Sequence, residues 1–198
     1  MVQSYEGMVK EDSDMTVWNR AFETLAEIVE YGRKKYGDFA PELFILDGST
    51  DFMFDLKVWL DDYMEFLEQE EEQEQLEKVC RKLLKLFAWE KASPSDIRFR
   101  LASSMLSLNK KKEAGDFCER WYGEDENDPA AAAALIYAWI ADRRFKDAQK
   151  VVDFWMDKEG GYTEENAEVF GAAAVLQNVF PGNGKDIQVQ YCSSCNKL

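Results

Sequence analysis

A repeat period of about 34 residues runs through the middle of the chain, and it limits the possible folds more than any other feature. Each unit of this length holds two runs of helical periodicity, with a leucine in the first run and a small residue early in the second. The positions are Leu67, Leu101 and Leu135 in the first runs, and Cys80, Ala114 and Ala148 in the second. Repetition at this period predicts stacked helical pairs. A helical bundle with a coincidental spacing is the alternative.

The two runs of each unit are amphipathic and meet at a polar corner. Apolar residues spaced by three and four give each run one buried stripe, as a helix requires. Helix starts are marked by a capping residue beside a proline in "SPSD" (93–96) and "DP" (128–129), and by a capping-box pattern in "TEEN" (163–166). Gly160 and Gly161 mark a helix end. We find no convincing strand alternation, so the fold is expected to be all-α.

These signals divide the chain into four parts. We expect a flexible N-terminal segment over residues 1–15, and an N-terminal helix with an irregular connection over residues 16–50. Asp51 is expected to begin a long helix, the first of the helical array over residues 51–180. Residues 181–198 follow as an extended tail.

Composition narrows the function. Hydrophobic residues make up 46% of the 198, which favours a folded core over disorder. A net charge of -15 disfavours binding to nucleic acid or to anionic membranes, since both need a positive surface. The chain has no histidine, which excludes Ser/His/Asp triads, Cys/His pairs and His-bearing metal sites. Carboxylates, lysines and thiols remain possible catalysts, but we expect no enzyme and no catalytic residues.

The paired runs resemble the tetratricopeptide repeat. The matching positions in one unit are Leu101, Ala102, Met105, Ala114 and Cys118, and in the next Leu135, Trp139, Phe145, Ala148 and Val152. Tyr63 to Trp155, about half of the chain, carries the resemblance. It departs from the family where Phe87, Trp121 and Trp155 occupy a position that is usually small. The resemblance implies a right-handed superhelix of antiparallel helix pairs, an α-solenoid with a concave groove lined by the first helix of each pair.

The groove is the candidate binding site that this resemblance implies. Its first helices would direct Phe99, Ser103, Ala133, Tyr137 and Ile140 toward a peptide or protein partner. Phe99 and Tyr137 are the expected anchors, although both are also ordinary residues of amphipathic helices. Apart from Arg98 and Arg100 these positions are neutral or acidic, so a basic or apolar segment is expected and an acidic tail is not.

The cysteines offer a second, weaker site. Cys192 and Cys195 in the tail have the spacing of half a zinc site, and completing it would need a second chain. A free thiol pair is the simpler interpretation and redox chemistry a third. Cys80 and Cys118 occupy apolar repeat positions. We therefore expect no cofactor, with an intermolecular zinc ion as the alternative.

Two further segments invite a functional interpretation. The acidic run Glu65–Glu77 lacks the glycine-containing loop of a calcium site and is interpreted as a solvated helical face. The stretch Leu43–Phe54 is superficially similar to the nucleophile loop of haloacid-dehalogenase-like phosphatases, but Ile45 stands where the nucleophilic aspartate would be. We expect Asp47 and Asp51 to form a turn and a helix cap instead.

The hypothesis drawn from the sequence is a non-catalytic adaptor or scaffold that binds a peptide or protein segment in its groove. The alternative is a homo-oligomer, with a homodimer as one form, assembled through exposed aromatic residues or through zinc at Cys192 and Cys195. The N-terminus does not look like a secretory signal, and no run approaches the length of a membrane span. The expected location is the cytoplasm.

Overall fold

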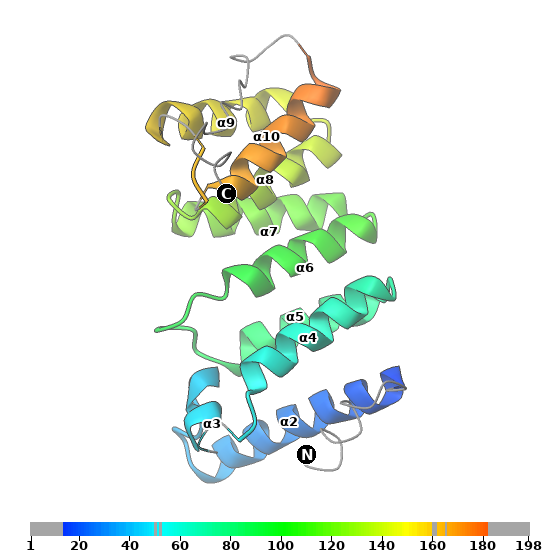
Figure 1. The fold of residues 1–198 in the computed structure, drawn as a ribbon, viewed down its shortest axis with the longest axis vertical. Helices are drawn as coiled ribbons and strands as arrows, with labels where there is room; N and C mark the ends of the chain where they lie inside the picture. Colours follow the sequence, from blue (N-terminus) through cyan, green and yellow to red (C-terminus); the bar gives the residue numbers. More distant parts are fainter. Residues whose placement is uncertain (1–13, 50, 52, 160–161, 165, 182–198) are drawn as a thin grey trace, which may run out of the picture. The chain divides into compact units, whose positions relative to one another are not determined.

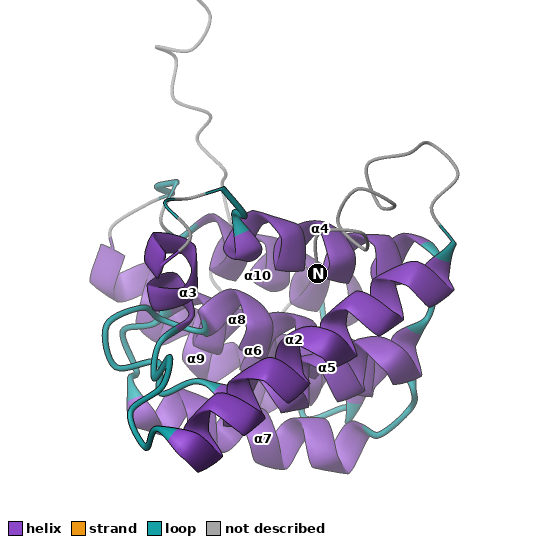
Figure 2. Cartoon of the chain, turned by 90° about the horizontal axis from the view of Figure 1, so that it is seen from below, coloured by secondary structure: helices purple, strands orange, loops and turns teal. Residues whose placement is uncertain are grey.

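The structure is a computed structural model that describes residues 14–181, except 50, 52, 160–161 and 165. Every regular element in these residues is a helix, which confirms the all-α prediction (Figure 2). The chain divides into two compact units, an N-terminal unit up to Ile97 and a C-terminal unit from Arg98. The helices in chain order are α2 Met15–Lys35, α3 Leu43–Ser49, α4 Leu56–Gln69, α5 Gln73–Leu86, α6 Ser95–Ser107, α7 Lys111–Glu124, α8 Pro129–Ala141, α9 Phe145–Glu159 and α10 Ala167–Val179 (Figure 1).

The N-terminal unit is built on aromatic packing between α2 and α4. Trp18 of α2 stacks on Trp59 and Tyr63 of α4, with ring centroids 6.1 and 5.8 Å apart. The hydroxyl of the fully buried Tyr63 donates to the side-chain carbonyl of Asn19, so its polar end is satisfied inside the unit.

The chain reversal after α2 depends on a glycine. A Cβ atom at Gly32 would lie 2.2 Å from the ring of Phe39, closer than any side-chain contact allows. The aromatic ring therefore packs directly on the backbone of the last turn of α2. Arg33 fixes the same reversal by donating hydrogen bonds to the carbonyls of Phe39 and Ala40.

The C-terminal unit is organised around α8, which packs against α7, α9 and α10 (Figure 1). Its five consecutive alanines, Ala130 to Ala134, are all buried, and so are Leu135, Ile136 and Ala138. A helix that is apolar on nearly all sides is stable only when other helices surround it. Small side chains let those helices approach closely, so α8 is the centre of this unit's core.

The helical pairs turn through one common corner geometry. The second residue after each first helix is in the left-handed conformation, at Glu71, Asn109 and Arg143, with φ of 58°, 58° and 60°. The next N–H reaches back over one turn to a carbonyl of the first helix, as in a Schellman motif. These bonds run from Glu72 to Leu67 (2.9 Å), from Lys110 to Met105 (2.8 Å) and from Arg144 to Trp139 (2.7 Å).

The corners correct the predicted register. The corners at Asn109 and Arg143 keep the predicted period, but those at Glu71 and Asn109 lie further apart. The four extra residues lie in the connection from α5 to α6, residues 87–94, because the corresponding connection from α7 to α8, residues 125–128, is half as long. By its distance from the corner, Leu76 rather than Cys80 corresponds to Ala114. Four residues are close to one helical turn, so both residues lie on the same buried face of α5.

Two local predictions about residues 16–55 were wrong. The connection expected to be irregular contains the short helix α3, and the following helix begins at Leu56 rather than at Asp51. Asp55 is the residue that caps it, by accepting the N–H of Val58 at 3.1 Å. Asp51 has a left-handed backbone with φ of 51°.

The predicted start of α8 is confirmed. Asp128 caps α8 by accepting the N–H groups of Ala130 and Ala131, with Pro129 in the first turn. Thr163 and Asn166 exchange the reciprocal side-chain and backbone hydrogen bonds of the predicted capping box, but α10 itself begins later, at Ala167, with Asn166 as its N-cap. Gly160 and Gly161 lie outside the described residues.

Ala148 provides a test of this core. Its side chain is completely buried in the core of the C-terminal unit, so Ala148→Glu would place an unpaired carboxylate there. We expect a loss of at least about 3 kcal/mol in the free energy of unfolding of this unit. Urea unfolding followed by hydrogen exchange of α7–α9 peptides would measure it. Lys146→Glu, at an exposed position of the same helix, is the control, and equal stability of the two variants would contradict the packing.

Candidate functional site

The C-terminal unit contains an open cavity of about 410 Å³ between α6 and α8. Its walls are mostly apolar and carry no charged side chain. The lining residues are Phe99, Ala102, Ser103, Leu106 and Ser107 of α6, and Ala134, Tyr137, Ile140 and Ala141 of α8. The volume lies within the range of ordinary ligand-binding pockets.

The structure brings four of the five predicted groove residues to this cavity. Phe99, Ser103, Tyr137 and Ile140 all line it. Ala133 does not, because its side chain is fully buried in the core around α8. The neighbouring Ala134 occupies the wall instead.

Sequence reasoning missed the remaining wall residues, although helical spacing contained the signal for them. Leu106 and Ser107 follow Ser103 by three and four positions on α6, and Ala141 follows Tyr137 by four on α8. Residues at these intervals lie on the same face of a helix. The same rule cannot decide among five adjacent alanines, since all of them are apolar and small.

Aromatic residues form one end of the cavity. The rings of Phe99 and Tyr137 meet edge to face, with centroids 6.4 Å apart, and so tie α6 to α8. On its other side the Tyr137 hydroxyl lies beside α10, where a Cβ atom at Gly171 would be 3.7 Å from its oxygen. Burial raises the pKa of the Tyr137 phenol, and the negative charge of Glu168 raises it further.

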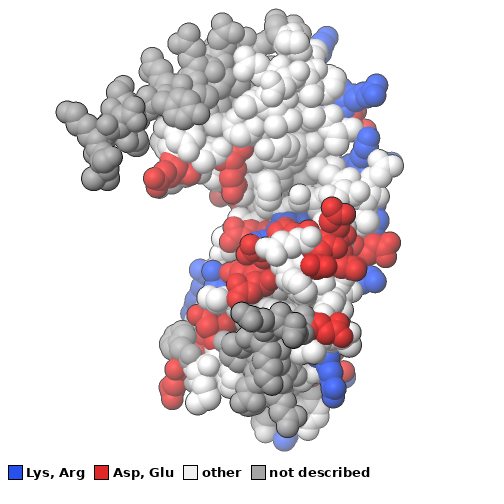
Figure 3. Space-filling model, turned by 45° about the vertical axis from the view of Figure 1, so that its right-hand side comes forward, with Lys and Arg blue, Asp and Glu red and all other residues white. Residues whose placement is uncertain are grey.

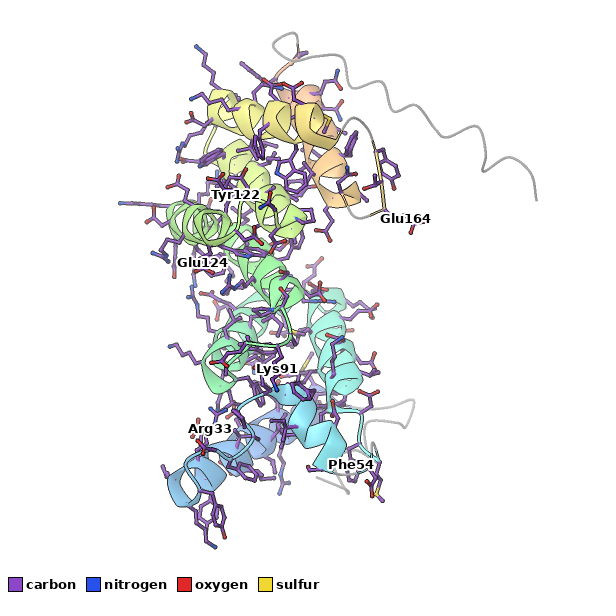
Figure 4. The ribbon with its side chains drawn as sticks, turned by 90° about the vertical axis from the view of Figure 1, so that its left-hand side faces the viewer. Arg33, Phe54, Lys91, Tyr122, Glu124 and Glu164 are labelled. Atoms are coloured by element: carbon purple, nitrogen blue, oxygen red, sulfur yellow. The ribbon has the colours of Figure 1, made fainter. Side chains whose placement is uncertain are left out.

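Arg98 is one of the two arginines that the sequence places beside the predicted groove, and its side chain is engaged elsewhere. Arg98 forms an ion pair of 2.6 Å with Glu124, the residue at the C-terminal end of α7 that is labelled in Figure 4. The guanidinium of Arg98 lies 5.8 Å from the ring centroid of Trp121. In the view of Figure 3, an uncharged area covers the part of the molecule formed by α8 and α10, with acidic side chains at its lower edge. The surroundings of the cavity are therefore neutral to acidic.

The candidate metal ligands Cys192 and Cys195 lie outside the described residues. Cys80 and Cys118 are buried thiols outside any disulfide, and burial together with the charge of Glu119 raises the pKa of Cys118 to about 12. A thiol with so high a pKa is a poor nucleophile and a poor metal ligand at neutral pH. In the described ranges no three acidic or cysteine side chains come together as a metal site would require.

The acidic run is only partly a solvated face. Glu65, Glu70 and Glu74 are exposed, but Glu77 is buried and forms an ion pair of 2.9 Å with Arg81 one turn later in α5. Glu77 therefore belongs to the packing of the N-terminal unit and is not part of an open acidic surface.

Asp47 lies in helix α3 and not in the predicted turn, and its side chain has a structural role. Its carboxylate accepts the N–H of Leu56 at 2.7 Å and so satisfies the first turn of α4 from outside that helix. Burial raises the pKa of Asp47, the hydrogen bond from Leu56 lowers it, and the charge of Asp55 raises it. The net direction is upward.

No protein-family model, no curated protein and no solved structure matches this chain. Across the residues that the structure describes, no helix is both long and apolar enough to cross a membrane. The fold and the cavity together define an all-helical protein of two units, with an uncharged cavity between two helices of the C-terminal unit.

Asp47 gives a prediction about pH. Because its pKa is raised in the folded state, the fold is more stable when Asp47 is protonated than when it is ionised. This extra stability is fully present below about pH 4 and is lost as the pH rises through the raised pKa. Asp47→Asn keeps an acceptor for Leu56 and removes the titration. The stability of this variant minus that of the wild type should therefore increase from pH 4 to pH 7. Urea midpoints measured at several pH values would test this, and a difference that falls with pH would contradict it.

Tyr137 gives a prediction about the electrostatics of the cavity. Glu168→Gln removes one of the two causes of its raised pKa, so the Tyr137 pKa should fall but stay above its ordinary value, because burial remains. NMR titration of tyrosine labelled with carbon-13 at the ring carbon that bears the hydroxyl would follow it, and Tyr137→Phe would assign the signal. Glu164→Gln, in the segment before α10, is the control (Figure 4). An unchanged pKa in Glu168→Gln would place that charge away from the hydroxyl.

Proposed function

We propose that the chain is a non-catalytic interaction module of tetratricopeptide-like build, an adaptor or scaffold that holds a peptide or protein segment. The binding site is the cavity between α6 and α8. The single observation that carries the proposal is this open, uncharged cavity, set against a helix whose other sides are packed in the core.

The matching positions of two helical pairs support the tetratricopeptide-like build. Helix α6 spans 95–107 and α8 spans 129–141, so the two helices are equal in length and offset by one repeat period at both ends. Their partners α7 and α9 begin at residues 111 and 145, with the same offset. Successive pairs of one geometry are the basis of a right-handed superhelical array, in which the first helices share one face.

Burial of apolar side chains would provide most of the binding energy. A leucine or phenylalanine transferred from water into such a cavity contributes about 1.5–3 kcal/mol. The rings of Phe99 and Tyr137 and the side chains of Leu106 and Ile140 offer apolar contacts around it. Because α8 is fixed by the core, little conformational entropy is lost in forming the wall.

Charge favours a basic or apolar segment over an acidic one. The chain has a net charge of -15, and Glu168 acts electrostatically on the Tyr137 hydroxyl at the cavity. Arg98 is already paired with Glu124, so it offers little to an incoming carboxylate. Cys192 and Cys195, on which a homo-oligomer held by the cysteine tail would depend, lie outside the described residues.

A peptide selection tests this function. We expect a displayed library of random twelve-residue peptides, selected on the full chain, to yield sequences with one or two apolar residues and few acidic ones. Their affinity, measured by fluorescence anisotropy, should fall at least tenfold for Ser103→Leu, which fills the cavity from an exposed wall position. Gln69→Leu, an exposed position in α4, is the control. Failure to enrich any peptide, or equal binding by Ser103→Leu, would overturn the proposal.

A further inference from the structure

Three of the residues that line the apolar cavity carry hydroxyl groups. Ser103 and Ser107 come from α6 and Tyr137 from α8, and within the described part of the chain none of the three hydroxyls donates or accepts a hydrogen bond. By contrast Ser104, which points into the core, is satisfied by the carbonyl of Leu101 at 2.9 Å. In an otherwise apolar pocket, a few polar groups of this kind orient the ligand.

The spacing of the two serines suits an extended chain. Residues four apart on a helix are separated by about 6 Å along its axis. Backbone groups on the same edge of an extended segment recur every two residues, about 6.6 Å. A segment lying along α6 could therefore hydrogen-bond to Ser103 and Ser107 with successive groups of one edge. Its side chains on the cavity side would enter the apolar space between them.

A helical ligand fits the same wall poorly. The backbone groups of a helix are already bonded to each other, so they would leave the three hydroxyls without partners.

Uncharged residues continue the repeat register of the cavity wall from α6 and α8 into α10. Ser103, Tyr137 and Gly171 follow one another at one repeat period each, and so do Ser107, Ala141 and Val175. All six are uncharged, and Val175 is 40% exposed. A side chain at Gly171 would meet only ordinary contact with Tyr137, so packing does not require glycine there, although glycine costs a helix about 1 kcal/mol relative to alanine. Its effect is to keep α10 open beside the phenol.

Charge specifies the ends of the segment. Helix α10 carries Glu168 in its first turn, close enough to the cavity to raise the pKa of Tyr137. A lysine or arginine near the apolar side chains would meet this negative field, whereas an acidic residue would be repelled.

We propose that the ligand of this cavity is an extended segment with apolar residues at alternate positions and a flanking basic residue. This inference rests on the proposed function. Ser103, Ser107 and Tyr137 hydrogen-bond to the backbone of the segment. The apolar side chains fill the cavity between α6 and α8, and the basic side chain lies toward Glu168.

The test uses three fluorescein-labelled, amidated heptapeptides and the full chain. The probe is Lys-Thr-Leu-Thr-Val-Thr-Lys, whose odd positions share one face when extended. One matched peptide replaces both lysines by glutamate, and the other replaces the three threonines by α-aminoisobutyrate, which favours helix. Anisotropy titrations to about 1 mM should show the probe binding more tightly than either matched peptide. Ser103→Ala, Ser107→Ala and Tyr137→Phe, which keep the cavity apolar, should each weaken it about 2- to 10-fold.

Each contrary result identifies what is wrong. Equal or tighter binding of the aminoisobutyrate peptide overturns the extended conformation, and equal binding of the glutamate peptide overturns the charge assignment. Unchanged affinity in all three hydroxyl variants overturns the hydrogen-bonding role. No binding of the probe at the highest concentration overturns the whole inference. The peptide selection then distinguishes failure of this inference from failure of the proposed function. If selected peptides bind the wild type but bind Ser103→Leu at least tenfold more weakly, the cavity remains the proposed binding site and only the kind of segment proposed here is wrong.

Discussion

The close packing of helices around the alanines of α8 is the constraint on which the C-terminal unit depends. Each alanine from Ala130 to Ala134 is buried, and α7, α9 and α10 all contact this helix. The arrangement also determines the properties of the cavity, because its α8 wall is the remaining side of an otherwise enclosed helix. Any ligand there would meet a surface that is already held in place. Such preorganisation lowers the entropic cost of binding.

Much of this arrangement could be predicted from the sequence, for physical reasons that also set the limit. Helical spacing places Tyr137 and Ile140 on one face of their helix, and the repeat register aligns Ser103, one unit earlier, with Tyr137. The run of alanines has no contrast between polar and apolar side chains, so Ala133 was assigned to the groove while the structure buries it. The direction of each alanine depends on the neighbouring helices, which periodicity within one helix does not describe.

The N-terminal unit was less predictable, because its details depend on contacts between distant segments. The connection in residues 87–94 is held by the N–H of Ala88 on the carbonyl of Pro41 (2.7 Å), and by two further N–H groups, those of Glu90 and Lys91, on the buried carboxylate of Glu42. No local pattern indicates such bonds. The longer connection also shifts the register by one helical turn, and a shift of one turn preserves the pattern of buried residues. Sequence periodicity alone therefore could not detect it.

The corners between paired helices have a consequence for how such a chain can change. Glu71, Asn109 and Arg143 share one left-handed backbone conformation although their side chains are acidic, neutral and basic. The conformation is held by backbone hydrogen bonds to carbonyls of the preceding helix, not by the chemistry of any side chain. Mutations at these exposed positions can therefore redistribute surface charge while the turn is maintained. The corners are places where the chain can acquire new surface properties at little cost to its architecture.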